Sequence, residues 1–492
     1  MSARFLSGRR ALGLLLAFAL TAAASARAEP PQAISPARPP GAGSSAPAAP
    51  GVAEANPRPP PVLEGIEPEP GGLTAAEVAR RVLAVSPSVQ QKRAEVTVAS
   101  EKITQTMIQF FPRVTLLASY LRLSPVSSMI GVPPASFTIK QIEDTFSAGA
   151  RLSIPLSDYV LRLADAAASS AASKEAARLA LEAERLKVAS DARALYFNWL
   201  RARAQAAIAE KAVERTRARL EDARAAFTVG AISRGELLRI EALVANTELV
   251  DARARSFVAL TMGQLAILME DPHPAYRVGE GVPDPAAVPE PKGDVTTLAY
   301  TAFERRLEVA AVAESAKAFR HGAGATRAGS LPRVDGVGDV TEASPNPRYF
   351  PPQKRWNATW SLGVQASWTI DDLFLGSAAA RELEANAAAM DARARALRGG
   401  IANEVLMAHL DLSRARVAYQ KQRVALDAAE EAYRVTTDLF RAGRATGTDL
   451  IEAEGGLLDA KLGDVNARID LTVAAISLRH ATGEDRADAP AR

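Results

Sequence analysis

The sequence contains one pattern twice, and this duplication limits the possible folds more than any other feature. Four pairs of segments match: Phe227–Gly230 with Phe440–Gly443, Glu236–Leu238 with Asp449–Ile451, Phe146–Gly149 with Trp360–Gly363, and Phe111–Val114 with Leu331–Val334. The offset between partners stays between 213 and 220 residues, so the insertions between the copies fall in loops. We therefore expect two copies of one structural unit, each with the order helix, strand, loop, strand, very long helix, tight turn and long helix.

Composition sets the boundaries of these copies. Basic residues and an apolar run precede Ala26-Arg27-Ala28, so we interpret residues 1–28 as a secretory signal peptide. Residues 29–72 are rich in Pro and Ala and are expected to be a disordered arm. Repeat 1 then spans 73–270, a Pro-rich linker spans 271–295, repeat 2 spans 296–483, and residues 484–492 are expected to be a flexible tail.

The long helices carry a heptad pattern. From Leu195 to Phe227, apolar or small residues recur at alternating spacings of four and three, with charged residues between them, and the second repeat matches from Ala408 to Phe440. The stretch from Asp158 to Phe227 contains neither Pro nor Gly, so as one helix it would be about 100 Å long. On its own, this pattern also suits a structural coiled coil.

Two segments alternate between apolar and polar residues, as a membrane-spanning β-strand does. They run from Phe146 to Leu156 and from Trp360 to Ile370. We expect one face to meet lipid; its predicted residues are Phe146, Leu152, Ile154, Trp360, Leu362, Val364 and Trp368. The strands near Val114–Leu123 and Val334–Thr341 are less regular in pattern.

No residue pattern points to enzyme chemistry. The chain has no cysteine, which excludes disulfides, thiolate metal sites and cysteine nucleophiles. The four histidines lack ligand spacing, and no phosphate loop, dinucleotide fingerprint or nucleophile elbow is present. The net charge is +3 without a basic block, which argues against nucleic acid. We predict no catalytic residues, no metal and no cofactor.

These features resemble the TolC-type outer-membrane efflux proteins over about residues 73–483. The resemblance is carried by the two Pro-Arg-Val segments at Pro112 and Pro332, by the Leu156-Ser-Asp and Ile370-Asp-Asp segments, and by the duplicated turns after Val229 and Ala442. It implies an α+β membrane protein in which three chains each give four strands to one 12-stranded barrel, continuous with a periplasmic α-helical coiled-coil tube. A four-stranded sheet has open edges that lipid does not tolerate, which independently implies that the chain oligomerises; the resemblance implies that the oligomer is a homotrimer.

The resemblance also implies functional positions. Asp449 and Glu452 correspond to the acidic residues at the family's periplasmic gate, and Glu236 is the counterpart of Asp449 in repeat 1, expected to help hold its tip. The tips that dock a periplasmic adaptor would contain Gly230, Ala231, Gly443, Arg444 and Ala445. Phe440 and Ala445 depart from the family, which often has Tyr and Arg there to latch the closed tip.

The implied function is the exit channel of a tripartite efflux or type I secretion system in the outer membrane of a Gram-negative cell. The implied partners are the periplasmic adaptor, outer-membrane lipid and, through the adaptor, an inner-membrane transporter of the RND, ABC or MFS type. Two alternatives are a periplasmic adaptor, which would have one helical hairpin between β-rich modules, and a structural coiled-coil protein of the cell envelope, which leaves the alternating strands unexplained.

Overall fold

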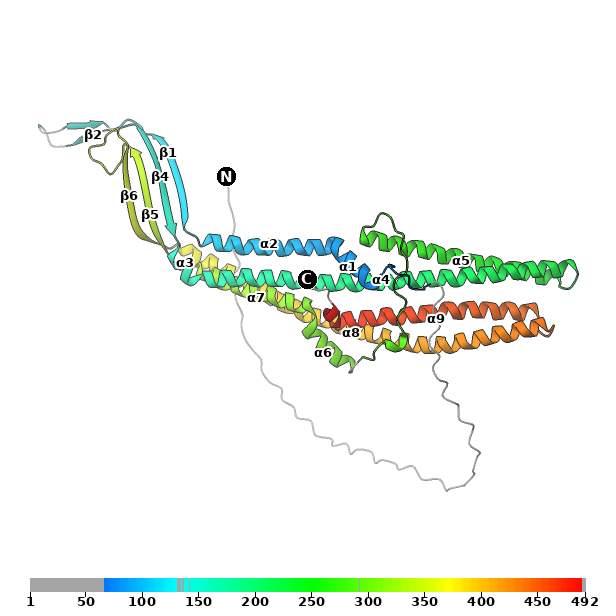
Figure 1. The fold of residues 1–492 in the computed structure, drawn as a ribbon. Helices are drawn as coiled ribbons and strands as arrows, with labels where there is room; N and C mark the ends of the chain where they lie inside the picture. The colour runs from blue at the N-terminus through cyan, green and yellow to red at the C-terminus, as the bar shows by residue number, and fades with distance from the viewer. Residues whose placement is uncertain (1–65, 131–133, 135–136, 141, 292, 489–492) are drawn as a thin grey trace, which may run out of the picture. The chain divides into compact units, whose positions relative to one another are not determined.

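The computed structural model describes residues 66–130, 134, 137–140, 142–291 and 293–488. The first half of this region contains α1 (Ala75–Val85), α2 (Pro87–Gln109), β1 (Arg113–Arg122), β2 (Ser127–Ile130), β3 (Phe137–Lys140), β4 (Asp144–Ile154), α3 (Leu156–Leu161), α4 (Leu163–Thr228) and α5 (Arg234–Met269) (Figure 1). The second half contains η1 (Pro285–Ala287), α6 (Val295–Arg305), α7 (Leu307–Ala328), β5 (Arg333–Ser344), β6 (Asn357–Ser367), α8 (Ile370–Arg441), α9 (Gly447–Ala481) and η2 (Glu484–Asp488). The two halves thus repeat one order of elements.

The four long strands form one antiparallel sheet in the order β1-β4-β5-β6. The two repeats meet where β4 pairs with β5, in a register that places Ala150 opposite Val340. Strands β1 and β6 each have one paired side, so both edges of this sheet are open within the chain. A separate hairpin of β2 and β3, which the sequence did not predict, lies in the connection between β1 and β4.

The helices next to the sheet keep the order of the strands. Helix α2 packs on α4, α4 on α7, and α7 on α8. Further along, α4 and α5 form one hairpin, α8 and α9 form the other, and α4 packs against α9. Among the described residues, no helix is both long and apolar enough to cross a membrane.

The largest hydrophobic core lies at mid-length of α4, where α1, α5 and α9 converge on it. Trp199, Tyr196 and Leu200 are its largest fully buried side chains. The Tyr196 hydroxyl lies 2.8 Å from the Leu73 carbonyl oxygen and 2.7 Å from that of Glu280. Because Leu73 begins repeat 1 and Glu280 lies in the linker that follows it, this side chain holds the two ends of the repeat together.

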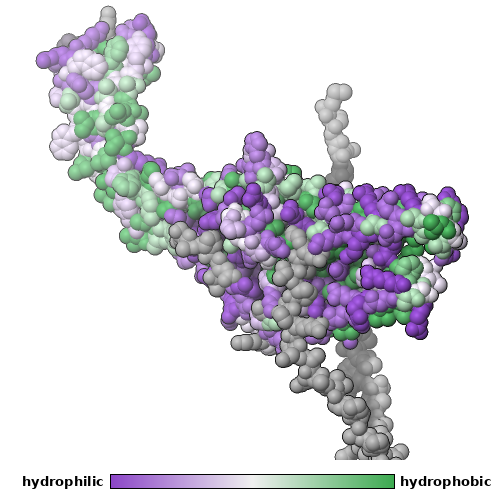
Figure 2. Space-filling model, turned by 45° about the vertical axis from the view of Figure 1, so that its right-hand side comes forward, coloured by the Kyte–Doolittle hydropathy of each residue, from purple (hydrophilic) through white to green (hydrophobic). Residues whose placement is uncertain are grey.

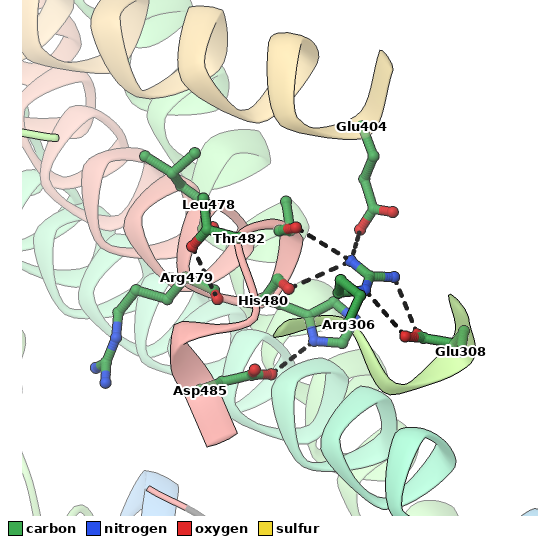
Figure 3. Close-up of polar contacts among 9 residues, drawn as sticks. Arg306, Glu308, Glu404, Leu478, Arg479, His480, Thr482 and Asp485 are labelled. Carbon is green, nitrogen blue, oxygen red and sulfur yellow. Dashed lines mark hydrogen bonds and ion pairs between the residues drawn. The ribbon is translucent and has the colours of Figure 1, made fainter. Parts of the chain in front are cut away.

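The C-terminal end of α9 is tied to the α6–α7 junction by Arg306 (Figure 3). This guanidinium donates to Glu308 at 3.0 Å and to Glu404 at 2.9 Å, and it also reaches the His480 carbonyl oxygen at 3.2 Å. The ring nitrogen Nδ1 of the same His480 lies 2.6 Å from a carboxylate oxygen of Asp485, a buried residue further along the chain. These contacts order the chain as far as η2.

Several boundaries differ from the sequence interpretation. The expected arm, residues 29–72, ends earlier, because Ile66 is only 3% exposed and packs into the main core. The expected tail, 484–492, begins as η2 because Asp485 is buried, and its last four residues lie outside the described region. The expected helix from Asp158 is divided at Arg162, and the expected strand to Ile370 ends at Ser367. The signal-peptide interpretation concerns residues outside the described region.

Candidate functional site

The four-stranded sheet has one apolar face and one polar face. The register aligns the apolar residues of all four strands: Val114, Leu116 and Tyr120 of β1, Phe146, Leu152 and Ile154 of β4, Val340 of β5, and Trp360, Leu362 and Val364 of β6. Leu362 is 80% exposed and Val364 is 71% exposed. Large apolar side chains on a face that no other described part of the chain covers indicate a partner or an apolar solvent.

Trp368 was expected on the same strand, but β6 ends one residue before it. Its indole Nε1 donates to the Ser330 carbonyl oxygen at 3.2 Å, which ties the start of α8 to the end of α7. The ring is still half exposed. Trp368 therefore lies at the junction between the sheet and the helices.

The other face of the sheet is lined mainly by hydroxyl, amide and charged groups, with Leu117 and Leu121 of β1 exposed among them. Ser119 and Ser147 share a hydrogen bond of 2.8 Å across β1 and β4, and the Ser361 hydroxyl donates to Asp339 across β5 and β6. Arg151 is paired in register with Asp339. A polar face of this kind is compatible with a water-filled interior if the sheet is closed into a barrel.

The turns that end α4 and α8 have the same geometry. Gly230 and Gly443 have φ values of +73° and +70°, which favour glycine because a side chain would be strained there. The following amide donates back to the helix, from Ala231 to the Ala226 oxygen at 2.9 Å and from Arg444 to the Leu439 oxygen at 2.8 Å. This is the Schellman motif in both tips, and it confirms that the predicted glycines end these helices.

The returning helices begin with matching caps. In α5 the Ser233 hydroxyl accepts from the Glu236 amide while the Glu236 carboxylate accepts from the Ser233 amide at 2.8 Å. In α9 Thr446 and Asp449 make the same reciprocal pair, also at 2.8 Å from amide to carboxylate. These backbone hydrogen bonds to the charged form lower the pKa of both carboxyl groups.

The two predicted gate residues lie at the start of α9. Asp449 and Glu452 are both exposed on the first turns of α9, at a spacing that places them on one helix face. Repulsion within an acidic ring would raise their pKa values, whereas the cap within this chain lowers the pKa of Asp449. Asp449 therefore has a local structural role, the same as that of Glu236, whether or not it also lines a gate.

Each tip carries a phenylalanine, and the two tips are linked to each other. At the first tip the Arg234 guanidinium lies 5.9 Å from the centre of the Phe227 ring, a cation–π distance. Phe440, the counterpart of Phe227, is half exposed, as is Arg444. One hydrogen bond of 2.9 Å, from Arg239 on α5 to Thr448 on α9, joins the two hairpins close to their tips.

A ladder of polar contacts joins the two hairpins along α4 and α9, and we call it the α4–α9 seam. Its members are the pairs Arg201–Asp470 at 2.6 Å, Gln205–Asn466 at 2.7 Å, Arg219–Glu454 at 3.4 Å and Arg215–Glu454 at 3.9 Å. From one pair to the next, the residue numbers increase along α4 and decrease along α9, as expected for two antiparallel helices. The seam thus fixes the position of one hairpin against the other.

Glu454 is the most buried charged group of the seam, with 4% of its side chain exposed. Desolvation raises the pKa of its carboxyl group, and the nearby charges of Arg219 and Arg215 oppose this shift without cancelling it. Sequence reasoning missed this cluster, because the heptad pattern assigns no partners to the charged residues between its apolar positions. The signal was present as one acidic residue on α9 facing two arginines a helical turn apart on α4.

A family model described as outer membrane efflux protein matches residues 78–267 and 298–484, which are the two repeats. A search of curated protein sequences finds no match.

Three solved structures show the same fold. The Campylobacter jejuni CmeC outer membrane channel is 17% identical, covering 83% of this chain and 85% of that chain, with a TM-score of 0.66. The open state of the Neisseria gonorrhoeae MtrE outer membrane channel is 17% identical, covering 83% and 88%, with a TM-score of 0.67. The Vibrio cholerae outer membrane protein VceC is 18% identical, covering 83% and 96%, with a TM-score of 0.63.

Proposed function

The chain belongs to the outer membrane efflux protein family, and on that premise we propose that it is the exit channel of a tripartite efflux or type I secretion system. It is an efflux channel of the outer membrane whose helical part lies in the periplasm. The observation that carries the proposal is the two-faced sheet, which offers an apolar face to lipid and a polar face to a channel. The family match covers both repeats, which neither alternative, adaptor or coiled-coil scaffold, explains.

We propose that three chains close one 12-stranded barrel. Each chain supplies four strands with open edges at β1 and β6. Unpaired edge amides and carbonyls are costly in hydrocarbon, so β6 of one chain pairs with β1 of the next until the ring closes. The helices beneath the strands follow the same order and extend the ring into a periplasmic tube.

The proposed partners follow from this arrangement. The helix tips face the periplasm and dock an adaptor, through which the channel meets an inner-membrane transporter of the RND, ABC or MFS type. The apolar face of the sheet contacts outer-membrane lipid. Transport through the channel is passive, because the proposed path consists of polar side chains and backbone.

Reconstitution in planar lipid bilayers tests the function. Purified trimers are expected to insert and produce discrete, uniform conductance steps, while a heat-dissociated sample produces none. Trimers that insert stably but never conduct would contradict a channel role.

The tips are predicted to be a contact surface as well as helix caps. A photo-crosslinking residue at Ala231 is expected to capture a periplasmic adaptor identified by mass spectrometry, and Ala445→Trp in the same chain is expected to abolish this capture. Ala231 is exposed and Ala445 half-buried beside the turn, so a bulky ring blocks the surface without entering the core. The crosslinker at Ala218, exposed on α4 before the tip, is the control. Unchanged capture with intact trimers would leave these residues only the capping role.

The gate prediction concerns Asp449 and Glu452. Three copies of each would form an acidic ring near the axis, so the double variant Asp449→Asn with Glu452→Gln is expected to weaken cation selectivity and block by multivalent cations. The side-chain oxygen of the asparagine can still accept a hydrogen bond from the Thr446 amide, so Asp449→Asn preserves the cap while it removes the charge. Single-channel recording measures the change, and Glu236→Gln, which alters the other cap, is the matched control.

The pH dependence has a defined sign. The folded-state pKa of Asp449 is below its ordinary value of 3.8, so the cap contributes stability above that value and loses it as pH falls through the lowered one. Repulsion between the carboxylates of the proposed ring would oppose this lowering of the pKa, and cation selectivity is expected to weaken as pH falls. A double variant whose selectivity and block equal those of the wild type would exclude an acidic ring at these positions.

A further inference from the structure

The apolar surface of the sheet does not stop where the strands end. It continues onto α3 and the start of α8, where the exposed apolar residues include Leu156, Tyr159, Val160, Ile370, Leu373 and Phe374. We call these six residues the collar. Figure 2 shows apolar colouring over the strands and over the helix ends beside them. Val160 is 81% exposed, an unusual state for a valine in a helix beside a packed bundle.

The α3 part of the collar lies on the same side as the apolar face of the sheet. A Cβ atom on Gly336 would stand 3.6 Å from Leu156 Cδ1, and Gly336 pairs with Ile154 and Val364 on that face. Tyr159 and Val160 follow Leu156 by three and four residues, so they share its helix face. Asp158 points the other way, where it is buried and its carboxylate lies 3.3 Å from Arg162.

A second copy of the chain cannot cover α3 by the lateral pairing proposed for the barrel. Helix α3 leads into α4, and α4 is flanked within the chain by α2 on one side and α7 on the other. Neighbouring copies would add only at β1 and α2 or at β6 and α8. The exposed side of α3 therefore faces outward, away from both the subunit contacts and the polar face.

The vertical extent of the apolar surface favours lipid as the occupant. On β4 the apolar face runs over eight residue steps from Phe146 to Ile154, which is about 27 Å along the strand and about 21 Å along the membrane normal at the usual tilt. Barrels of the outer membrane present an apolar band about 25 Å tall. One turn of α3 adds about 5 Å, which completes that band.

Aromatic residues occupy both limits of this extended surface. At the outer limit Tyr120, Phe146 and Trp356 form a cluster with ring centroids 4.9 Å and 6.4 Å apart. At the helical limit Tyr159 and Trp368 are exposed. Aromatic girdles mark the two interfaces of a membrane barrel, and here the second girdle lies on α3 and at the junction before α8, beyond the ends of the strands.

We propose that the α3 part of the collar, Leu156, Tyr159 and Val160, is a lipid-binding surface that inserts into the inner leaflet of the outer membrane at the boundary between headgroups and acyl chains. The proposal rests on the proposed function, because it requires the sheet to be a membrane barrel. It places the membrane boundary within α3. This short helix thus belongs to the membrane-embedded part of the protein.

Site-directed spin labelling in phospholipid vesicles tests the collar. The chain has no cysteine, so Val160→Cys carries the only label. Leu362→Cys on the sheet is the lipid reference and Ala218→Cys on α4 is the water reference. Accessibility to oxygen relative to a water-soluble nickel chelate is expected to be highest at 362, intermediate at 160 and lowest at 218. Tyr159→Cys provides the same measurement if Val160→Cys trimers do not assemble.

The outcomes separate the two proposals. A label at 160 that matches the water reference, while 362 reports lipid, would overturn the collar and leave the channel intact. A label at 160 that is immobile and inaccessible to both reagents would show that protein covers α3, which also overturns the collar. A label at 362 that reports water would remove the barrel itself.

Discussion

Leu362→Arg is expected to prevent most of the protein from assembling in the outer membrane. Leu362 lies near the middle of the apolar face, opposite Gly338 and level with Leu152. An arginine on the lipid face of a barrel costs about 2–4 kcal/mol near the bilayer midplane and about 0–1 kcal/mol near the interfaces. Val364→Arg, closer to the helices, is therefore expected to have a smaller effect than Leu362→Arg.

The matched control is Gln365→Arg on the same strand. Gln365 lies on the polar face opposite Asp335, so an arginine there gains a carboxylate neighbour and stays in water. The measurement is the fraction of protein in the membrane that migrates differently with and without boiling. If Leu362→Arg and Gln365→Arg assembled equally well, the assignment of the lipid and channel faces would be wrong.

Removing both arginines of the Glu454 cluster is expected to open the α4–α9 seam. With Arg215→Ala and Arg219→Ala, the buried carboxylate keeps its desolvation cost and loses both attractions. Removing one partner of a buried ion pair costs about 3–5 kcal/mol. Because the two arginines are partly exposed, we expect the cost here to be at or below this range. The local opening free energy of α9 around Glu454, from native-state hydrogen exchange, measures the loss.

Two further variants identify the cause. Arg217→Ala removes an arginine of the same helix whose partner, Glu248, is exposed, so its cost should remain below about 1 kcal/mol. Adding Glu454→Gln to the double variant removes the buried charge and is expected to recover most of the lost stability. If the triple variant were as unstable as the double one, packing rather than charge would account for the effect.

The seam also has a defined pH dependence. The folded-state pKa of Glu454 is raised above its ordinary value of 4.5, so its contribution to stability is fully present below that value and is lost as pH rises through the raised one. The double variant should raise this pKa further, because the opposing attraction of the arginines is gone. Its loss of stability is therefore expected to be smaller in acidic buffer than at neutral pH.

The sequence predicted the features that depend on periodicity. The heptad positions Trp199, Ala209 and Leu412 are buried, and the alternation in β4 and β6 appears as one apolar face. Even the irregular segment that became β5 has the expected position. Glycines stand at positions of β5 where large side chains of a neighbouring strand lie close, as Leu362 does at Gly338. These glycines interrupt the alternation of apolar and polar residues, so the local sequence pattern of this strand is weak.

Features that depend on tertiary neighbours were not predictable. Burial of Glu454 requires knowing that α9 packs on α4 as well as on α8. The helix is divided at Arg162, and β6 ends early at Ser367; both places lie where a strand leads into a helix. Neither Arg162 nor the segment from Ser367 to Ile370 contains a Gly or Pro that would have marked the boundary in the sequence. The docking tips and the gate remain predictions, because they concern surfaces that only partner chains complete.

Disulfide crosslinking between the two open edges of the sheet tests the central claim most directly. One cysteine on β6, at Ser361, is combined with single cysteines along β1 in the cysteine-free chain, and the protein is oxidised in the membrane. A closed ring of three chains predicts that one register of pairs gives covalent trimers through β6-to-β1 bonds, with no larger species. Covalent products that stop at dimers, or no product at any β1 position in assembled protein, would contradict a trimeric barrel of four strands per chain.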